Sequence, residues 1–165
     1  MRILAVLLLL AVAAATGAAA APLKARADLI VVDKTKRVMT LYARKKPLKT
    51  YRIALGGNPL GHKEQEGDSR TPEGRYVIDA KNPWSSFHLS LRISYPNRRD
   101  MAAARRKGVS PGGQIMIHGT PEGLSLVQAT GLMRDWTAGC IAVTNAEIEE
   151  IYRAVNVGTP IVIKP

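Results

Sequence analysis

Apolar and polar residues alternate in the first part of the chain after residue 27, and short polar turns divide this part into segments. Residues 29–32 are apolar and largely β-branched, residues 38–42 follow a charged turn, and residues 48–55 place Tyr51, Ile53 and Leu55 on one face. Such alternation between short polar turns is typical of an antiparallel sheet. We therefore predict a series of antiparallel strands here.

The alternation stops at residues 56–70, where glycines lie among charged residues, and this composition predicts a loop. His62, Glu64, Glu66 and Asp68 follow no known metal-ligand spacing, so we predict a solvated loop and no metal site. The chain then resumes strand character at residues 76–78, after a turn with proline in its second position and glycine in its fourth.

Two stretches carry helix signals. Asp100 to Gly108 predicts a short helix with Asp100 as its cap and Gly108 as its end. The Thr144–Glu147 capping box predicts a second helix, which we expect to end at Gly158. Because residues 114–118 and 160–163 again read as strands, the prediction is a mostly β single domain with one or two short helices.

The first residues read as a signal peptide. Arg2 precedes an apolar run, and alanines at residues 18–21 supply a cleavage site, so we expect a signal peptide at 1–20, a short segment at 21–27 and the domain at 28–165. The apolar run is shorter than the roughly 20 residues of a membrane span, so we expect no stable span. The predicted location is the periplasm or cell wall.

The formal charge of +11 suggests an acidic partner. Arg98–Arg99 and Arg105–Lys107 could form a basic patch for nucleic acid. We expect no nucleic acid as partner, because the chain reads as exported and offers no aromatic platform on which bases stack.

Candidate chemistry centres on Cys140, the only cysteine, and on His118. A lone cysteine is usually a small packing residue. A single cysteine in an exported chain is less usual, and an imidazole can take the thiol proton. Gly119 and Gly139, the neighbours of these two residues, allow close approach of the backbone to a reacting group.

These residues resemble the signature of the L,D-transpeptidase catalytic (YkuD) domain, in which a histidine is followed, after a spacer, by Ser/Thr-His-Gly-Cys, an apolar residue and usually Arg. The chain has His118-Gly119 and then Thr137-Ala138-Gly139-Cys140-Ile141-Ala142. Ala138 stands at the second histidine and Ala142 at the arginine. The Arg70–Gly74 loop adds to the resemblance, which covers residues 27–164.

The resemblance implies an open β-sandwich or barrel and a cysteine acyltransferase that needs no metal or organic cofactor. His118 would be the base, and the Gly119 carbonyl would hold its other nitrogen. Backbone N–H groups of Ala138, Gly139 and Cys140 would bind the oxyanion, with Thr137 either fixing the turn or hydrogen-bonding the substrate. The substrates would be peptidoglycan stem peptides, with a second stem, an acceptor protein or a D-amino acid resolving the thioester.

His88, Arg134 and Trp136 are candidates for contact with substrate. His88 lies in a segment with local aromatics that could face Cys140 across a groove, and the other two precede the cysteine motif. If they do not bind substrate, His88 would pack at a sheet edge, Arg134 would lie on the surface and Trp136 would lie in the core. Two other functions remain open: an L,D-carboxypeptidase or other peptidoglycan-directed cysteine hydrolase, and a non-catalytic cell-wall-binding module.

Overall fold

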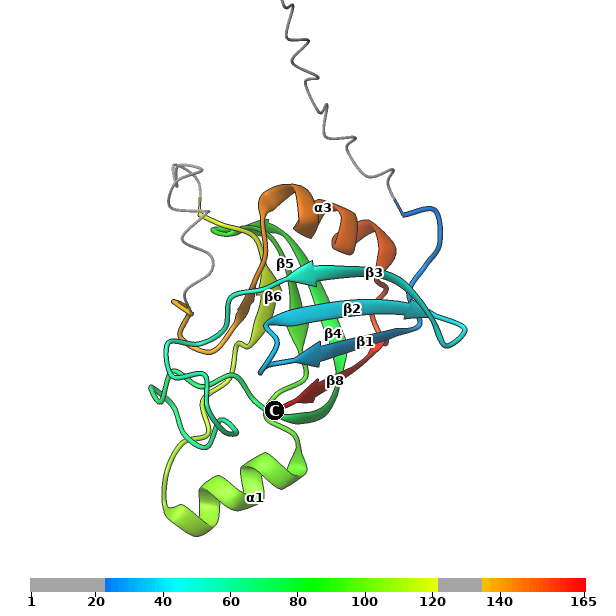
Figure 1. Cartoon of the computed structure of the whole chain (residues 1–165). Helices are drawn as coiled ribbons and strands as arrows, with labels where there is room; N and C mark the ends of the chain where they lie inside the picture. The colour runs from blue at the N-terminus through cyan, green and yellow to red at the C-terminus, as the bar shows by residue number, and fades with distance from the viewer. Residues whose placement is uncertain (1–22, 122–134) are drawn as a thin grey trace, which may run out of the picture.

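The computed structural model describes residues 23–121 and 135–165, and the expected signal peptide lies outside them. An eight-stranded sheet with the order β3-β2-β1-β8-β4-β5-β6-β7 forms the body of the protein and curls into a half-barrel (Figure 1). Its strands are β1 (Leu29–Asp33), β2 (Val38–Ala43), β3 (Lys46–Arg52), β4 (Gly74–Ser85), β5 (His88–Ile93), β6 (Met116–His118), β7 (Ile141–Ala142) and β8 (Pro160–Lys164).

The first three strands form the predicted antiparallel meander. Ile30, Val32, Met39 and Leu41 are buried at alternate positions, as their period of two requires. Tyr51 continues this buried face on β3, with Ile53 and Leu55 beyond the strand. The alternation prediction is therefore confirmed.

Strand β4 makes the sheet curl. Its first residues pair with β8, and its residues from Ile78 onward pair with β5, with a register shift between Ile78 and Ala80. Such irregularities bend a strand and increase its local twist. The C-terminal strand β8 lies between β1 and β4 and is parallel to β1, so the ends of the described domain meet within one sheet.

Helices α1 (Arg98–Lys107) and α3 (Asn145–Ala154) lie at opposite ends of the curled sheet (Figure 1). Asn97, not Asp100, caps α1: the Asn97 side chain accepts from the helix backbone, and Asp100 supplies the third-position carboxylate of the same capping box. Gly108 ends this helix in the left-handed conformation, as predicted.

The Thr144–Glu147 capping box begins α3 as predicted. The predicted end at Gly158 is wrong, because the chain becomes extended at Val155. There the backbone of Ala27 pairs with Val155, and the Ala27 N–H donates to the Ala154 carbonyl at 2.9 Å. Pairing with the N-terminal segment thus replaces further helical turns.

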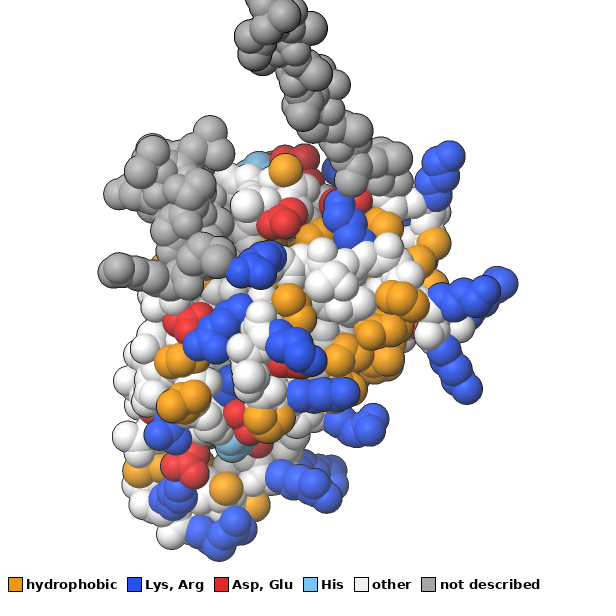
Figure 2. Space-filling view, in the orientation of Figure 1, with side chains coloured by type: hydrophobic (Ala, Val, Ile, Leu, Met, Phe, Trp, Pro, Cys, Tyr) orange, Lys and Arg blue, Asp and Glu red, His pale blue; other side chains and the backbone are white. Residues whose placement is uncertain are grey.

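The described part of the chain is mostly β with two short helices, so the predicted fold class is confirmed. None of its helices is long and apolar enough to cross a membrane. Lys and Arg side chains spread over the visible face of the molecule instead of gathering in one patch (Figure 2).

Glu150 attaches α3 to the edge of the sheet. Glu150 is 7 % exposed, and its carboxylate accepts from Lys49 Nζ at 2.5 Å, Tyr51 Oη at 3.0 Å and the Leu23 N–H at 3.1 Å. Burial alone raises the pKa of Glu150, but these three donors together hold it below its usual value. The carboxylate therefore stabilises the fold in its charged form.

We predict that Glu150→Gln lowers the free energy of unfolding by about 1–3 kcal/mol at pH 7, because the variant loses a charge-assisted network. The folded pKa is depressed, so the stabilisation is complete above the ordinary carboxyl pKa of 4.5 and is lost as pH falls through the folded value. Urea unfolding followed by circular dichroism should show the two proteins converging as pH falls below 4.5.

Glu149→Gln is the matched control, since Glu149 precedes Glu150 on the same helix but its side chain is 46 % exposed. We expect it to change the free energy of unfolding by at most about 0.5 kcal/mol. Equal losses in the two variants would contradict the role assigned to Glu150.

Candidate active site

A short parallel pairing brings the two candidate catalytic residues together. Ile117 pairs with Ile141 and His118 pairs with Ala142 in adjacent strands β6 and β7. Cys140 directly precedes β7 and lies two residues before Ala142. Because side chains two residues apart in extended chain share a face, we infer that Cys140 and His118 face the same side of the sheet as diagonal neighbours.

His118 is 4 % exposed, and its ring orientation is fixed by the next residue along the chain. Its Nδ1 donates to the Gly119 carbonyl oxygen at 2.6 Å, which leaves Nε2 as the acceptor in the neutral ring. Burial lowers the pKa of His118, and the bond to Gly119 only partly opposes this effect. The resting imidazole is therefore neutral and able to take a proton.

Cys140 is half-buried, and its Sγ lies against the segment that leads into β6. The thiol donates to the Gln114 carbonyl at 3.5 Å. Burial raises the pKa of Cys140, although the Met116 N–H and the charge of Lys63 act in the opposite direction. The resting pair is consequently a neutral thiol beside a neutral base, and proton transfer between them can accompany attack.

Close packing around Gly119 fixes the position of its carbonyl, which accepts from His118 Nδ1. A Cβ atom at this position would lie 2.4 Å from Asn145 Oδ1 and 2.9 Å from the Phe87 carbonyl oxygen. The same Asn145 oxygen accepts from the Thr120 N–H at 2.7 Å. Asn145 at the start of α3 therefore holds the chain just after the base, and only glycine fits there.

Thr137 organises the turn before the cysteine. Its hydroxyl donates to the Cys140 carbonyl at 2.8 Å and accepts from the Gly139 N–H at 3.1 Å. Of the three N–H groups expected to bind an oxyanion, that of Gly139 is thus engaged within the turn. No described residue accepts a hydrogen bond from the N–H of Ala138 or Cys140.

The loop at residues 56–73 braces this turn from outside. A Cβ atom on Gly139, which has a φ of +133°, would lie 2.6 Å from the Arg70 carbonyl oxygen. A Cβ atom on Gly56 would lie 2.1 Å from the Ser69 carbonyl oxygen. Both glycines are required because backbone packs directly on backbone.

A buried ion pair gives the loop its shape, so the prediction of a solvated loop is wrong for these two residues. Lys63 is 3 % exposed, and its Nζ lies 2.7 Å from Asp68 Oδ1. Asp68 also accepts from the N–H groups of Glu64, Gln65 and Arg70. Although burial raises the pKa of Asp68, Lys63 and these N–H groups hold it at about 2. Sequence spacing gave no sign of this pairing.

Aromatic rings form a wall beside the base. The Phe87 ring centroid lies 4.5 Å from that of His118, and the Trp136 centroid lies 5.8 Å from it. Phe87 and Trp136 remain 36 % and 40 % exposed, so both rings can meet a ligand. Trp136 is among the residues that the sequence predicts to contact substrate, whereas Phe87 lies in the segment of local aromatics that also contains His88.

The other two candidates for substrate contact differ in position. His88 has a positive φ, and its Nε2 lies 2.9 Å from Glu149 Oε1 on α3, so its ring is paired with the helix. Arg134 lies outside the described residues. Within residues 23–121 and 135–165, no group of three His, Cys, Asp or Glu side chains could hold a metal ion.

The two alanines of the motif lie in different surroundings. Ala142 is fully buried, pairs with His118 on one side, and exchanges two backbone hydrogen bonds of 2.9 Å with Ala54 on the other. An arginine would need space that this position lacks. Ala138 is exposed, so a larger side chain fits there.

Comparison with known proteins shows the family of the chain. Residues 27–163 match the family model of the L,D-transpeptidase catalytic domain. YafK of Escherichia coli (strain K12), named as a candidate L,D-transpeptidase, is 29 % identical over 133 residues, which cover 77 % of this chain and 46 % of YafK. The chain thus spans about half the length of this relative.

Solved structures show the same fold. The helical cell shape determining protein Pgp2 from Campylobacter jejuni superposes with a TM-score of 0.66 at 24 % identity, covering 86 % of this chain and 48 % of Pgp2. An L,D-transpeptidase from Mycobacterium smegmatis superposes with a TM-score of 0.57 at 18 % identity, covering 84 % and 59 %. By its family match and its fold, the chain belongs to the L,D-transpeptidase catalytic domain family.

Proposed function

We propose that this protein is an exported L,D-transpeptidase that acts on peptidoglycan stem peptides through a thioester on Cys140. One observation carries the proposal: the parallel register of β6 and β7 places Cys140 and His118 on one face, while the Gly119 carbonyl holds His118 Nδ1 and leaves Nε2 free. Family membership supplies the peptidoglycan substrate class.

In the first half-reaction, His118 Nε2 takes the proton of the Cys140 thiol as sulfur attacks the carbonyl carbon of the L-centred residue. The oxyanion is met by the N–H groups of Ala138 and Cys140. Collapse breaks the bond to the terminal D-residue, whose amine takes the proton from His118. The products are a thioester and a free D-amino acid.

In the second half-reaction, an acceptor amine attacks the thioester and gives its proton to His118. The carbon–sulfur bond breaks, and the proton returns to the sulfur of Cys140. Water in place of the amine would make the protein an L,D-carboxypeptidase. Phe87 and Trp136 beside the base would limit the access of water during this step.

Export and a role in cell shape complete the proposal. The signal-peptide pattern at residues 1–20 supports secretion to the periplasm or cell wall. The fold shared with Pgp2, which is described as a helical cell shape determining protein, supports a contribution to wall shape. Acceptor proteins and free D-amino acids are further candidate acyl acceptors.

Incubation with a disaccharide tetrapeptide and, separately, with a carbapenem tests this function. We predict that intact mass spectrometry shows one acyl adduct on the wild-type protein and none on Cys140→Ala, with release of D-alanine from the tetrapeptide. Released tripeptide would identify hydrolysis, and a dimer would identify transfer. Absence of both the adduct and D-alanine would instead favour a cell-wall-binding module, in which Cys140 only packs.

We predict that Thr137→Val lowers the rate of acylation by about 10-fold or more, because the turn that presents the N–H groups loses both hydrogen bonds of the Thr137 hydroxyl. Thr137→Ser keeps the hydroxyl and should retain most of the activity. The measurement is the rate of acylation by the carbapenem at saturating concentration. Similar rates in the Val variant and the wild type would show that the hydroxyl does not position the turn.

We predict that Lys63→Met raises the pKa of the Cys140 thiol further, because a buried positive charge near the thiolate is lost. The pH dependence of iodoacetamide alkylation measures this value, and the wild-type midpoint should already lie above 9.0, since burial raises it. Lys107→Met is the control: Lys107 pairs with Glu64 of the same loop at 2.8 Å but its side chain is 50 % exposed. An unshifted Lys63→Met profile would contradict the prediction.

A further inference from the structure

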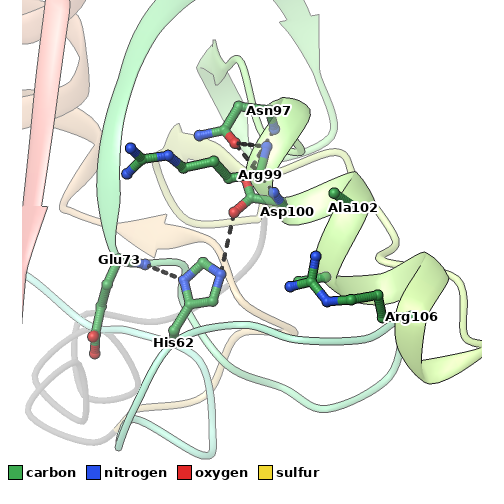
Figure 3. A pocket seen from close by; sticks show the side chains of 8 residues that line it. His62, Glu73, Asn97, Arg99, Asp100, Ala102 and Arg106 are labelled. Carbon is green, nitrogen blue, oxygen red and sulfur yellow. Dashed lines mark hydrogen bonds and ion pairs between the residues drawn. The ribbon is translucent and has the colours of Figure 1, made fainter.

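A second concave site lies between α1 and the loop at residues 56–73, apart from the residues of the active site. This groove has a volume of about 570 Å³ and is lined by His62, Glu73, Asn97, Arg99, Asp100, Ala102, Ala103 and Arg106 (Figure 3). None of these residues takes part in the chemistry proposed for Cys140. The groove therefore needs an explanation of its own.

The floor of the groove is a fixed hydrogen-bond network. His62 Nδ1 accepts from the Glu73 N–H at 2.9 Å, so its proton lies on Nε2, which is 3.2 Å from Asp100 Oδ1. Asp100 also accepts from Tyr76 Oη and the Asn97 N–H. The Glu73 carboxylate lies 2.7 Å from Lys34 Nζ. Both acidic side chains of the groove are thus already satisfied by protein donors.

The two arginines of the groove, by contrast, carry uncompensated charge. Neither the Arg99 nor the Arg106 guanidinium has a hydrogen-bond or ion-pair partner among the described residues. Figure 3 shows the two groups on either side of the His62 ring. Ala102 and Ala103 lie between them in the helix and leave the space open.

The spacing of the arginines defines what they could hold. They are seven residues apart on α1, so they share one side of the helix about 10 Å apart along its axis. An extended peptide advances about 3.3 Å per residue, so carboxylates three residues apart match this distance. Guanidinium groups bind carboxylates through paired hydrogen bonds, and the alanine methyl groups suit the intervening backbone.

We propose that this groove binds an extended peptide segment bearing two carboxylate groups about three residues apart, one on Arg99 and one on Arg106. The groove is too large for a single inorganic anion. Its two carboxylates already accept hydrogen bonds from the protein, so the ligand meets the two unpaired guanidinium groups. Binding here does not depend on the reaction at Cys140. An extended, acidic segment of a partner protein carries carboxylates with this spacing.

The helix itself provides a matched control. Arg98 and Arg105 are also seven residues apart on α1 and are exposed, but they do not line the groove. A double variant Arg98→Gln/Arg105→Gln therefore removes the same charge from the same helix as Arg99→Gln/Arg106→Gln. Only the second pair should matter for a ligand in the groove.

Fluorescence anisotropy at 0.15 M salt, with labelled Glu-Gly-Gly-Glu as the probe, tests the proposal on the full-length mature protein. We expect Arg99→Gln/Arg106→Gln to raise Kd at least about 10-fold and the control pair at most about threefold. A peptide with adjacent glutamates should bind more weakly than the probe. We expect an unlabelled acidic protein segment to displace the probe; displacement by a disaccharide tetrapeptide alone would contradict a protein partner.

Equal weakening in both double variants would overturn the proposal, since it would indicate attraction to net charge alone. Failure of the wild-type protein to bind the probe would overturn it as well. Circular dichroism of each variant checks that the helix is intact. Carbapenem acylation of Cys140 is measured separately, so failure of the groove and failure of the proposed enzyme remain distinguishable.

Discussion

The short parallel ladder between β6 and β7 is the constraint on which the site depends. Strand β7 has only two residues, so it cannot hold its own position. Ala54 bonds to Ala142 on the far side, and the Val143 N–H donates to the His118 carbonyl at 3.0 Å. Ile117 and Ile141 are fully buried beneath this ladder. Moving β7 by one residue along β6 would take Ile141 away from the face it shares with Ile117 and turn Cys140 away from His118.

Burial sets the protonation state of the pair as well as its position. It raises the pKa of Cys140 and lowers that of His118, so both groups are neutral before substrate binds. Attack therefore needs a base in place at the moment of reaction, which explains why His118 Nδ1 is fixed so firmly by Gly119. The charge of Lys63 favours the thiolate that forms, without producing it in the resting protein.

The fold class, the strand alternation and the candidate dyad could be predicted from sequence, because each is encoded by neighbouring residues: a period of two, a capping box, or His118 and Cys140 beside glycines. What could not be predicted depends on contacts between distant segments. Asp100 and Asn97 are both capping residues, and only the geometry of α1 decides between them. The sequence around Lys63 does not indicate that this lysine is buried. Phe87 reaches His118 through a contact between distant segments, because the Phe87 carbonyl accepts from the Gly119 N–H at 3.1 Å.

The loop at residues 56–73 connects the active site to the groove on α1. One side of it presses on Gly139, and the other contributes His62 to the groove. Asp68, with Lys63 and three backbone N–H groups, fixes the loop from within, so its shape does not require a ligand. A loop that is already ordered gains little further order from binding. The structure therefore favours a groove that attaches the protein to an acidic peptide over one that switches Cys140 on or off.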